Sequence, residues 1–155
     1  MRVTILAVGR LKAGPEALLT ADWLGRFDAA GRALGLGPAR MIEVEDRRGR
    51  GADAEAALLL DKAPDGPLVA LDERGAALDS PGFARRLAAF RDEGARDLGF
   101  AIGGADGHGA GLRDRADLLL SFGPMVWPHM LARAMLAEQL YRAATILGGG
   151  PYHRA

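Results

Sequence analysis

Short apolar runs alternate with longer helical patterns along this chain, and the alternation constrains the fold more than any other feature. Runs rich in Val, Ile and Leu predict buried strands at residues 2–8, 40–44, 68–71, 97–102 and 118–121. Helical patterns follow them at residues 15–36, 52–62, 80–93, 112–117 and 129–147. This order predicts an α/β fold with one mostly parallel sheet and helices on both faces.

Local signals refine the prediction at three places. Ser80 can cap a helix and Pro81 fits the first helical position, so a helix is expected to begin there. The charged stretch 72–75 predicts a polar turn after the third strand. The first helix is expected to bury one face, which carries Leu18, Leu19, Trp23 and Phe27.

The last helical pattern, at 129–147, is apolar on all sides rather than along one stripe. A helix of that kind is buried all round. In a chain of 155 residues, a terminal helix needs another surface to cover it, and a partner subunit is the simplest source. We therefore expect a partner subunit to cover this helix, on the basis of Leu131, Met135, Leu136, Leu140, Tyr141, Ala144, Ile146 and Leu147.

Length and composition exclude several classes of protein. The 155 residues suit a single domain over 1–155, and the absence of Cys excludes disulfides and thiolate catalysis. Lys and Arg number 20, as do Asp and Glu, which argues against a general nucleic-acid coat but leaves room for a small RNA site. No apolar run approaches the ~20 residues that span a bilayer, and no targeting segment is visible. A cytoplasmic protein is expected.

Glycines and apolar residues gather after three of the predicted strands. The loop 103–111 follows one strand, the loop 122–127 follows another, and Leu71 ends a third. Ligands of open α/β sheets bind at the carboxyl ends of strands, so these segments predict a small-ligand pocket. A flexible turn and ordinary core packing remain the plain alternatives. The glycine loop lacks the P-loop pattern and fits a dinucleotide fingerprint only loosely.

Polar residues stand out in a basic loop and near the C-terminus. Arg47, Arg48 and Arg50 form the densest positive spot, which could face RNA, although charge runs are usually just solvated. The tail 151–154 combines an aromatic ring, an imidazole and a guanidinium, which can stack on a base and hold a phosphate. A solvated face is the alternative here too. No two His stand at i,i+4, so no metal site is expected.

Five segments together resemble a known family. They are Leu71-Asp72-x-x-Gly75, Ile102-Gly103-Gly104-x-x-Gly107, Trp127-Pro128-His129, Ala137-Glu138-Gln139-Leu140-Tyr141-Arg142-Ala143 and Pro151-Tyr152-His153-Arg154. Over essentially its whole length the chain is similar to the small bacterial large-subunit rRNA pseudouridine N3-methyltransferases of the SPOUT (α/β-knot) superfamily. It departs from many of them at Gly149-Gly150, before the tail, and at Met130, after the Pro-His pair.

The resemblance implies a five-stranded parallel sheet with a C-terminal trefoil knot, a homodimer, and S-adenosylmethionine as methyl donor without a metal. The implied substrate is N3 of a pseudouridine in a 23S rRNA hairpin loop on the assembled ribosome. The implied donor site comprises Leu71, Gly103, Gly104, Phe122, Gly123, Pro124, Met125, Val126 and Trp127. The candidate catalytic residues are His153 as proton acceptor, Tyr152 and Arg154, and the candidate RNA contacts are Arg47, Arg48, Arg50, His129, Arg133 and Arg142.

Two other functions stay open at this stage. The chain could be a knotted methyltransferase that acts on another RNA, such as tRNA. It could also be a non-catalytic nucleotide-binding or ribosome-associated module that keeps the pocket without the activity. A dehydrogenase is a distant third.

Overall fold

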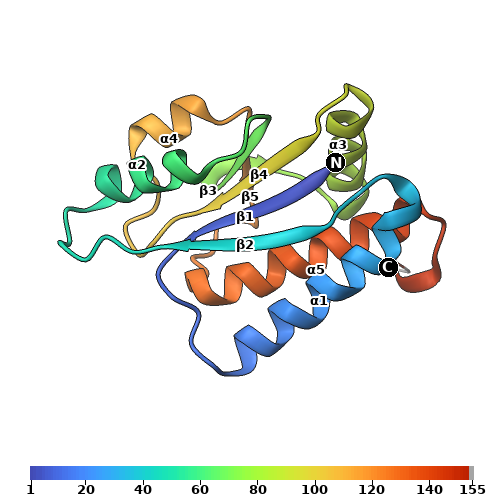
Figure 1. Cartoon of the computed structure of the whole chain (residues 1–155), viewed down its shortest axis with the longest axis horizontal. Coiled ribbons are helices and arrows are strands. Elements are labelled where there is room, and N and C mark those ends of the chain that lie inside the picture. Colours follow the sequence, from blue (N-terminus) through green and yellow to red (C-terminus); the bar gives the residue numbers. More distant parts are fainter. Residues whose placement is uncertain (154–155) are drawn as a thin grey trace.

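A computed structural model describes residues 1–153, and its centre is one sheet of five parallel strands (Figure 1). The strands are β1 (Arg2–Val8), β2 (Ala39–Val44), β3 (Leu68–Ala77), β4 (Asp97–Ile102) and β5 (Leu118–Ser121). They lie in the order β2-β1-β4-β3-β5, and every neighbouring pair is parallel. The predicted α/β fold is confirmed.

Helices cover both faces of the sheet, as Figure 1 shows. On one face lie α2 (Ala52–Lys62) and α4 (Ala110–Arg115), and on the other lie α1 (Pro15–Gly31), α3 (Ser80–Asp92) and α5 (His129–Leu147). The short 3₁₀ turns η1 (Arg32–Leu34) and η2 (Pro151–His153) follow α1 and α5. Alternate residues of β1 serve the two faces, since Ile5 and Ala7 join the core under α1, α3 and α5 while Leu6 and Val8 join the other.

Two predicted helices have different bounds in the structure. The first ends at Gly31 instead of residue 36, because the chain tightens into the η1 turn and then reverses at Gly35, whose φ of 70° is left-handed. The fourth, predicted at 112–117, begins at Ala110 and ends at Arg115.

The predicted cap of α3 was wrong by one residue. Asp79 caps the helix, with its Oδ1 accepting from the backbone N–H of Gly82 at 2.7 Å. The Ser80 hydroxyl instead donates to Gln139 Oε1 at 2.9 Å and so links α3 to α5.

The third strand is longer than predicted. Residues 72–75 leave the ladder, as a turn would, but pairing with β5 resumes at Ala76, so that Leu71 and Ala76 both align with Leu120. The excursion is tight: a Cβ on Gly75 would lie 2.5 Å from the backbone carbonyl of Leu119. The Ser121 hydroxyl also donates to the Glu73 carbonyl at 3.2 Å. The polar stretch therefore passes closely around β5, and only a glycine fits at that point.

One predicted face of α1 is not covered within the chain. Phe27 is buried, but Leu18 is 73% exposed and Leu19 is 45% exposed. Among the described residues, no helix is both long and apolar enough to cross a membrane.

Candidate functional site at the strand ends

The carboxyl ends of β3, β4 and β5 meet around a cavity of about 760 Å³. Three segments form its wall: the excursion after Leu71, the glycine loop after β4, and the loop between β5 and α5. Of the nine residues predicted to hold a methyl donor, eight line it; Pro124 belongs to the same loop but does not. Those eight are Leu71, Gly103, Gly104, Phe122, Gly123, Met125, Val126 and Trp127. The structure brings the predicted pocket together, while the role of each residue stays a prediction.

The loop between β5 and α5 gives the cavity an apolar and open side. Val126 is 84% exposed and Met125 is 69% exposed, which is unusual for such large apolar side chains. The Trp127 indole N–H donates to the Phe122 carbonyl at 3.4 Å, closing the loop on itself. Exposed apolar groups on the rim of a cavity are typical of a surface that a ligand or a partner covers.

The glycine loop is too tightly folded for side chains at its first two positions. A Cβ on Gly103 would lie 2.8 Å from the Gly107 carbonyl oxygen, and one on Gly104 would lie 2.8 Å from a carboxylate oxygen of Glu55. The N–H of Gly107 donates to the Gly104 carbonyl at 3.1 Å, which closes the turn. Burial raises the pKa of Glu55, and the nearby Asp106 raises it further. Backbone packing therefore requires a glycine at position 103, whereas a side chain at position 104 would have to displace the Glu55 carboxylate.

The cavity also contains charged residues that the sequence analysis did not select. Asp72 is almost buried and accepts hydrogen bonds from Arg74 Nε and Nη2, both at 2.8 Å. These bonds hold the pKa of Asp72 below its usual value. His108 is buried with Nε2 3.2 Å from the Ala101 carbonyl, and burial lowers its pKa. Their positions directly after Leu71 and within the glycine loop could have identified them.

The predicted RNA-contacting residues lie in different environments. Arg47, Arg48 and Arg50 are exposed on the loop after β2, where Arg50 Nε lies 3.2 Å from an Asp46 oxygen. His129 lines the cavity, and burial followed by the nearby charge of Arg133 lowers its pKa.

The prediction that Arg133 holds RNA phosphates was wrong for this conformation. Its side chain is fully buried. Its guanidinium donates to Glu43 Oε1 at 2.8 Å, to the Val8 carbonyl at 2.6 Å and to the Gly9 carbonyl at 2.8 Å. Its Nε has no partner in the described part of the chain, but the burial of the whole side chain leaves a phosphate no access to the group.

The described part of the tail turns back along α5 and does not line the cavity. His129, at the start of α5, lines the cavity, and the 19-residue helix carries the chain away from it before the tail returns. The Tyr152 hydroxyl donates to Glu138 Oε1 at 2.9 Å, which places it beside the middle of α5, nine residues or roughly 14 Å of helix from His129. The Tyr152 ring packs 4.7 Å from that of Tyr141 and beneath the guanidinium of Arg142, which pairs with Glu138 at 2.7 Å. Within one chain, Tyr152 is therefore not at the cavity.

The side chain of His153 and the whole of Arg154 lie outside the described residues. Among residues 1–153, no cluster of three or more His, Asp or Glu side chains is placed to hold a metal ion.

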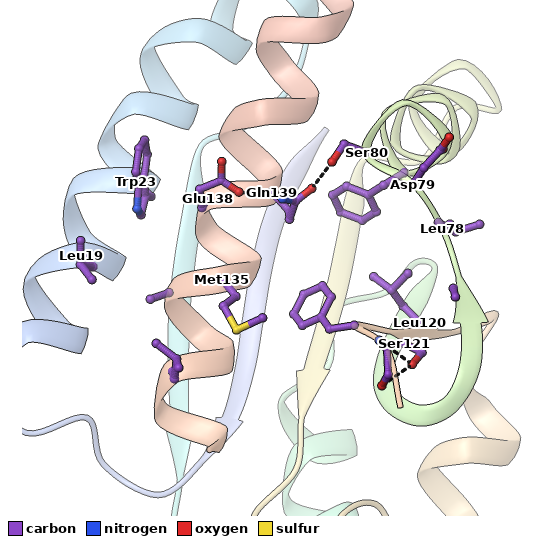
Figure 2. Close-up of a pocket in the computed structure, with 16 residues that line it drawn as sticks. Leu19, Trp23, Leu78, Asp79, Ser80, Leu120, Ser121, Met135, Glu138 and Gln139 are labelled. Atoms are coloured by element: carbon purple, nitrogen blue, oxygen red, sulfur yellow. Dashed lines mark hydrogen bonds between the residues drawn. The ribbon is translucent and has the colours of Figure 1, made fainter. Parts of the chain in front are cut away.

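A second, more apolar groove of about 670 Å³ lies between α1, α5 and the start of α3. Figure 2 shows Leu19 and Trp23 on one side, Met135 and Glu138 from α5, and Leu78 on the opposite wall. Leu120, Phe122 and Gly123 line both cavities, so the groove adjoins the strand-end site.

Comparison with known proteins identifies the class. A family model described as "Predicted SPOUT methyltransferase" matches residues 1–153, and the chain belongs to this family. The family implies the C-terminal trefoil knot. The fold is similar to that of a probable methylase family protein from Haemophilus influenzae Rd KW20, with a TM-score of 0.50 at 10% identity over 99% of this chain and 70% of that one.

The chain is more similar still to curated relatives of its own size. It is 64% identical to a protein of Ruegeria pomeroyi and 64% identical to one of Paracoccus denitrificans. Both matches cover 99% of each chain, and both relatives are named "Ribosomal RNA large subunit methyltransferase H".

Proposed function

We propose that this protein transfers the methyl group of S-adenosylmethionine to N3 of a pseudouridine in 23S rRNA, on the assembled ribosome. The observation that carries the proposal is the 64% identity, over nearly the full length of both chains, with relatives named for methylation of large-subunit rRNA. The strand-end cavity supplies a matching site. Since bacterial ribosomes work in the cytoplasm, we place the enzyme there.

The cavity suits a nucleoside-sized donor. Its volume of about 760 Å³ lies within the range of small-molecule sites. Leu71 and the loop 122–127 offer an apolar wall, while Gly103 and Gly104 let a ligand approach the backbone closely. When bound there, the donor supplies an electrophilic methyl group on its sulfonium.

The chain's own contribution is alignment and proton transfer. The loop 122–127 and the glycine loop hold the methyl group in line with N3 of the base. Alignment of this kind can supply a large part of an enzyme's rate enhancement. N3 must lose a proton, and His153 is our candidate acceptor because imidazole titrates nearest neutral pH. Tyr152 and Arg154 would orient the base and its phosphates.

We infer that the protein acts as a homodimer in which each tail serves the partner's cavity. Tyr152 packs beside the middle of α5 and does not line the cavity of its own chain, so a second copy is the direct way to bring the tail to a site. The apolar groove of Figure 2, flanked by the exposed Leu18 and Leu19, offers a surface for that copy next to the strand-end cavity.

The oligomer is tested by sedimentation. We expect Leu19→Glu to shift the protein from dimer to monomer and to abolish transfer, while Arg96→Met, at an exposed position before β4, leaves both unchanged. A wild-type protein that sediments as a monomer at assay concentration would overturn the dimer.

The reaction is tested with methyl-labelled S-adenosylmethionine and ribosomes that lack the modification. Label at N3 of one 23S pseudouridine supports the proposal. Label only in another RNA, such as tRNA, would favour a different knotted methyltransferase. Donor binding without transfer to any RNA would favour a binding module. Unchanged transfer by His153→Ala across pH would remove the proposed acceptor.

A further inference from the structure

Arg133 is the largest fully buried side chain of the protein's described part, and its bonds join four segments. It projects from the second turn of α5, donates to Glu43 on β2, and donates to the carbonyls of Val8 and Gly9 at the end of β1. Glu43 Oε1 in turn accepts the N–H of Leu11, in the loop before α1, at 2.6 Å. The Arg133 Nε has no partner among the described residues, but removing the guanidinium would leave the buried Val8 carbonyl and two half-buried acceptors without these hydrogen bonds, so the side chain is held in one place.

His129 lies beside the same backbone segment at the end of β1. It precedes Arg133 by four residues and so lies on the same face of α5. Both side chains pack on Gly9: a Cβ at that position would lie 3.8 Å from His129 Nε2 and 3.9 Å from Arg133 Nη2. His129 also lines the strand-end cavity. The backbone that Arg133 holds is therefore the surface on which the His129 imidazole rests.

We propose that Arg133 is a positioning residue that acts through His129, holding the imidazole against Gly9 at the edge of the cavity where methyl transfer takes place. This inference rests on the proposed function. Arginine suits the role because its planar group can donate to a carboxylate and to two carbonyls at once, which the single ammonium of a lysine does less well.

The charged surroundings agree with a neutral imidazole at that place. Burial lowers the pKa of His129, and the cation of Arg133 lowers it further. The cation is partly balanced by Glu43 on β2. The cavity that His129 lines also contains Asp72, Glu73, Arg74, Asp106, His108 and Arg113. A neutral ring can accept a hydrogen bond or a proton from a bound substrate.

The test compares Arg133→Lys, His129→Gln and the double variant, with Arg96→Met as a charge-removing control at an exposed position. Thermal unfolding and donor titration calorimetry first establish that each protein is folded. We expect Arg133→Lys to lower kcat/KM for methyl transfer at least tenfold, and we expect no further loss when it is added to His129→Gln. In the proton NMR spectrum, assigned with His129→Gln, the His129 signal should move and titrate at a different pH in Arg133→Lys.

A folded Arg133→Lys protein with an unchanged His129 signal, or losses that add in the double variant, would overturn the inference. If Arg133→Lys does not fold, Glu43→Gln is tested in its place. This variant removes the carboxylate charge that pairs with the guanidinium and leaves the bonds to the Val8 and Gly9 carbonyls. The NMR signal needs no RNA, so a failure of the proposed substrate is distinguishable from a failure of this inference.

Discussion

Replacing Gly103 by Ala is the sharpest test of the glycine loop. The added Cβ would lie 2.8 Å from the Gly107 carbonyl oxygen and 2.9 Å from its carbon, where ordinary contact begins near 3.4 Å. Both atoms are backbone, so no side chain can rotate away, and the loop itself must open. Overpacking of this kind costs about 1–3 kcal/mol.

Part of that cost appears in donor binding, because the opened turn is a wall of the cavity. Since about 1.4 kcal/mol corresponds to a factor of ten, half of that cost would make the donor bind roughly twofold to tenfold more weakly. Titration calorimetry with S-adenosylmethionine measures the affinity, and urea unfolding measures the stability.

Gly111→Ala is the matched control. This glycine lies within α4, close to the loop, and its Cβ would meet nothing within 4 Å. Removing a glycine from a helix should stabilise the protein by about 0.5–1 kcal/mol and leave donor affinity unchanged. Wild-type affinity in a folded Gly103→Ala protein would refute the reasoning, since it would mean that the loop opens without disturbing the site.

Three further predictions follow from the charges of the site and the tail. Hydrogen bonds from Arg74 lower the pKa of Asp72, so the ionised carboxylate stabilises the fold above about pH 4, and this stabilisation is lost as the pH falls further. In Asp72→Asn the free energy of unfolding, measured in urea as a function of pH, should fall less on acidification. Burial lowers the pKa of His108, so on acidification below about pH 6.5 the unfolded chain binds a proton that the folded chain does not. Stability should therefore fall there, and less so in His108→Gln. Glu138→Gln should loosen the tail, measured as faster hydrogen exchange around Tyr152, whereas an unchanged rate would show that ring packing alone holds it.

The sheet and the pocket were predictable because they depend on local patterns. Each strand is a short run of branched apolar residues, and parallel strands place the segments after Leu71, Ile102 and Ser121 at one edge. The resumption of β3 at Ala76 could not be predicted, since it depends on pairing with Leu120, more than forty residues later.

Arg133 was misinterpreted for a related reason. A single arginine within an apolar helix is usually exposed, and only the tertiary fold brings Glu43 and two strand-end carbonyls to it. The tail motif indicated chemistry without indicating where it acts. The position of Tyr152, packed beside the middle of α5 and outside the cavity lining, became apparent only from the structure.

The close passage of residues 72–75 around β5 has a consequence for how the protein matures. Ala76 and Ala77 pair with β5 and Gly75 packs against it, so the excursion gains these contacts only once β5 is in place. One wall of the cavity is that excursion, and another is the loop that follows β5. A nascent chain that ends before residue 118 therefore carries most of the sheet but no site. The strand-end cavity therefore forms late in synthesis, after the last quarter of the chain has folded.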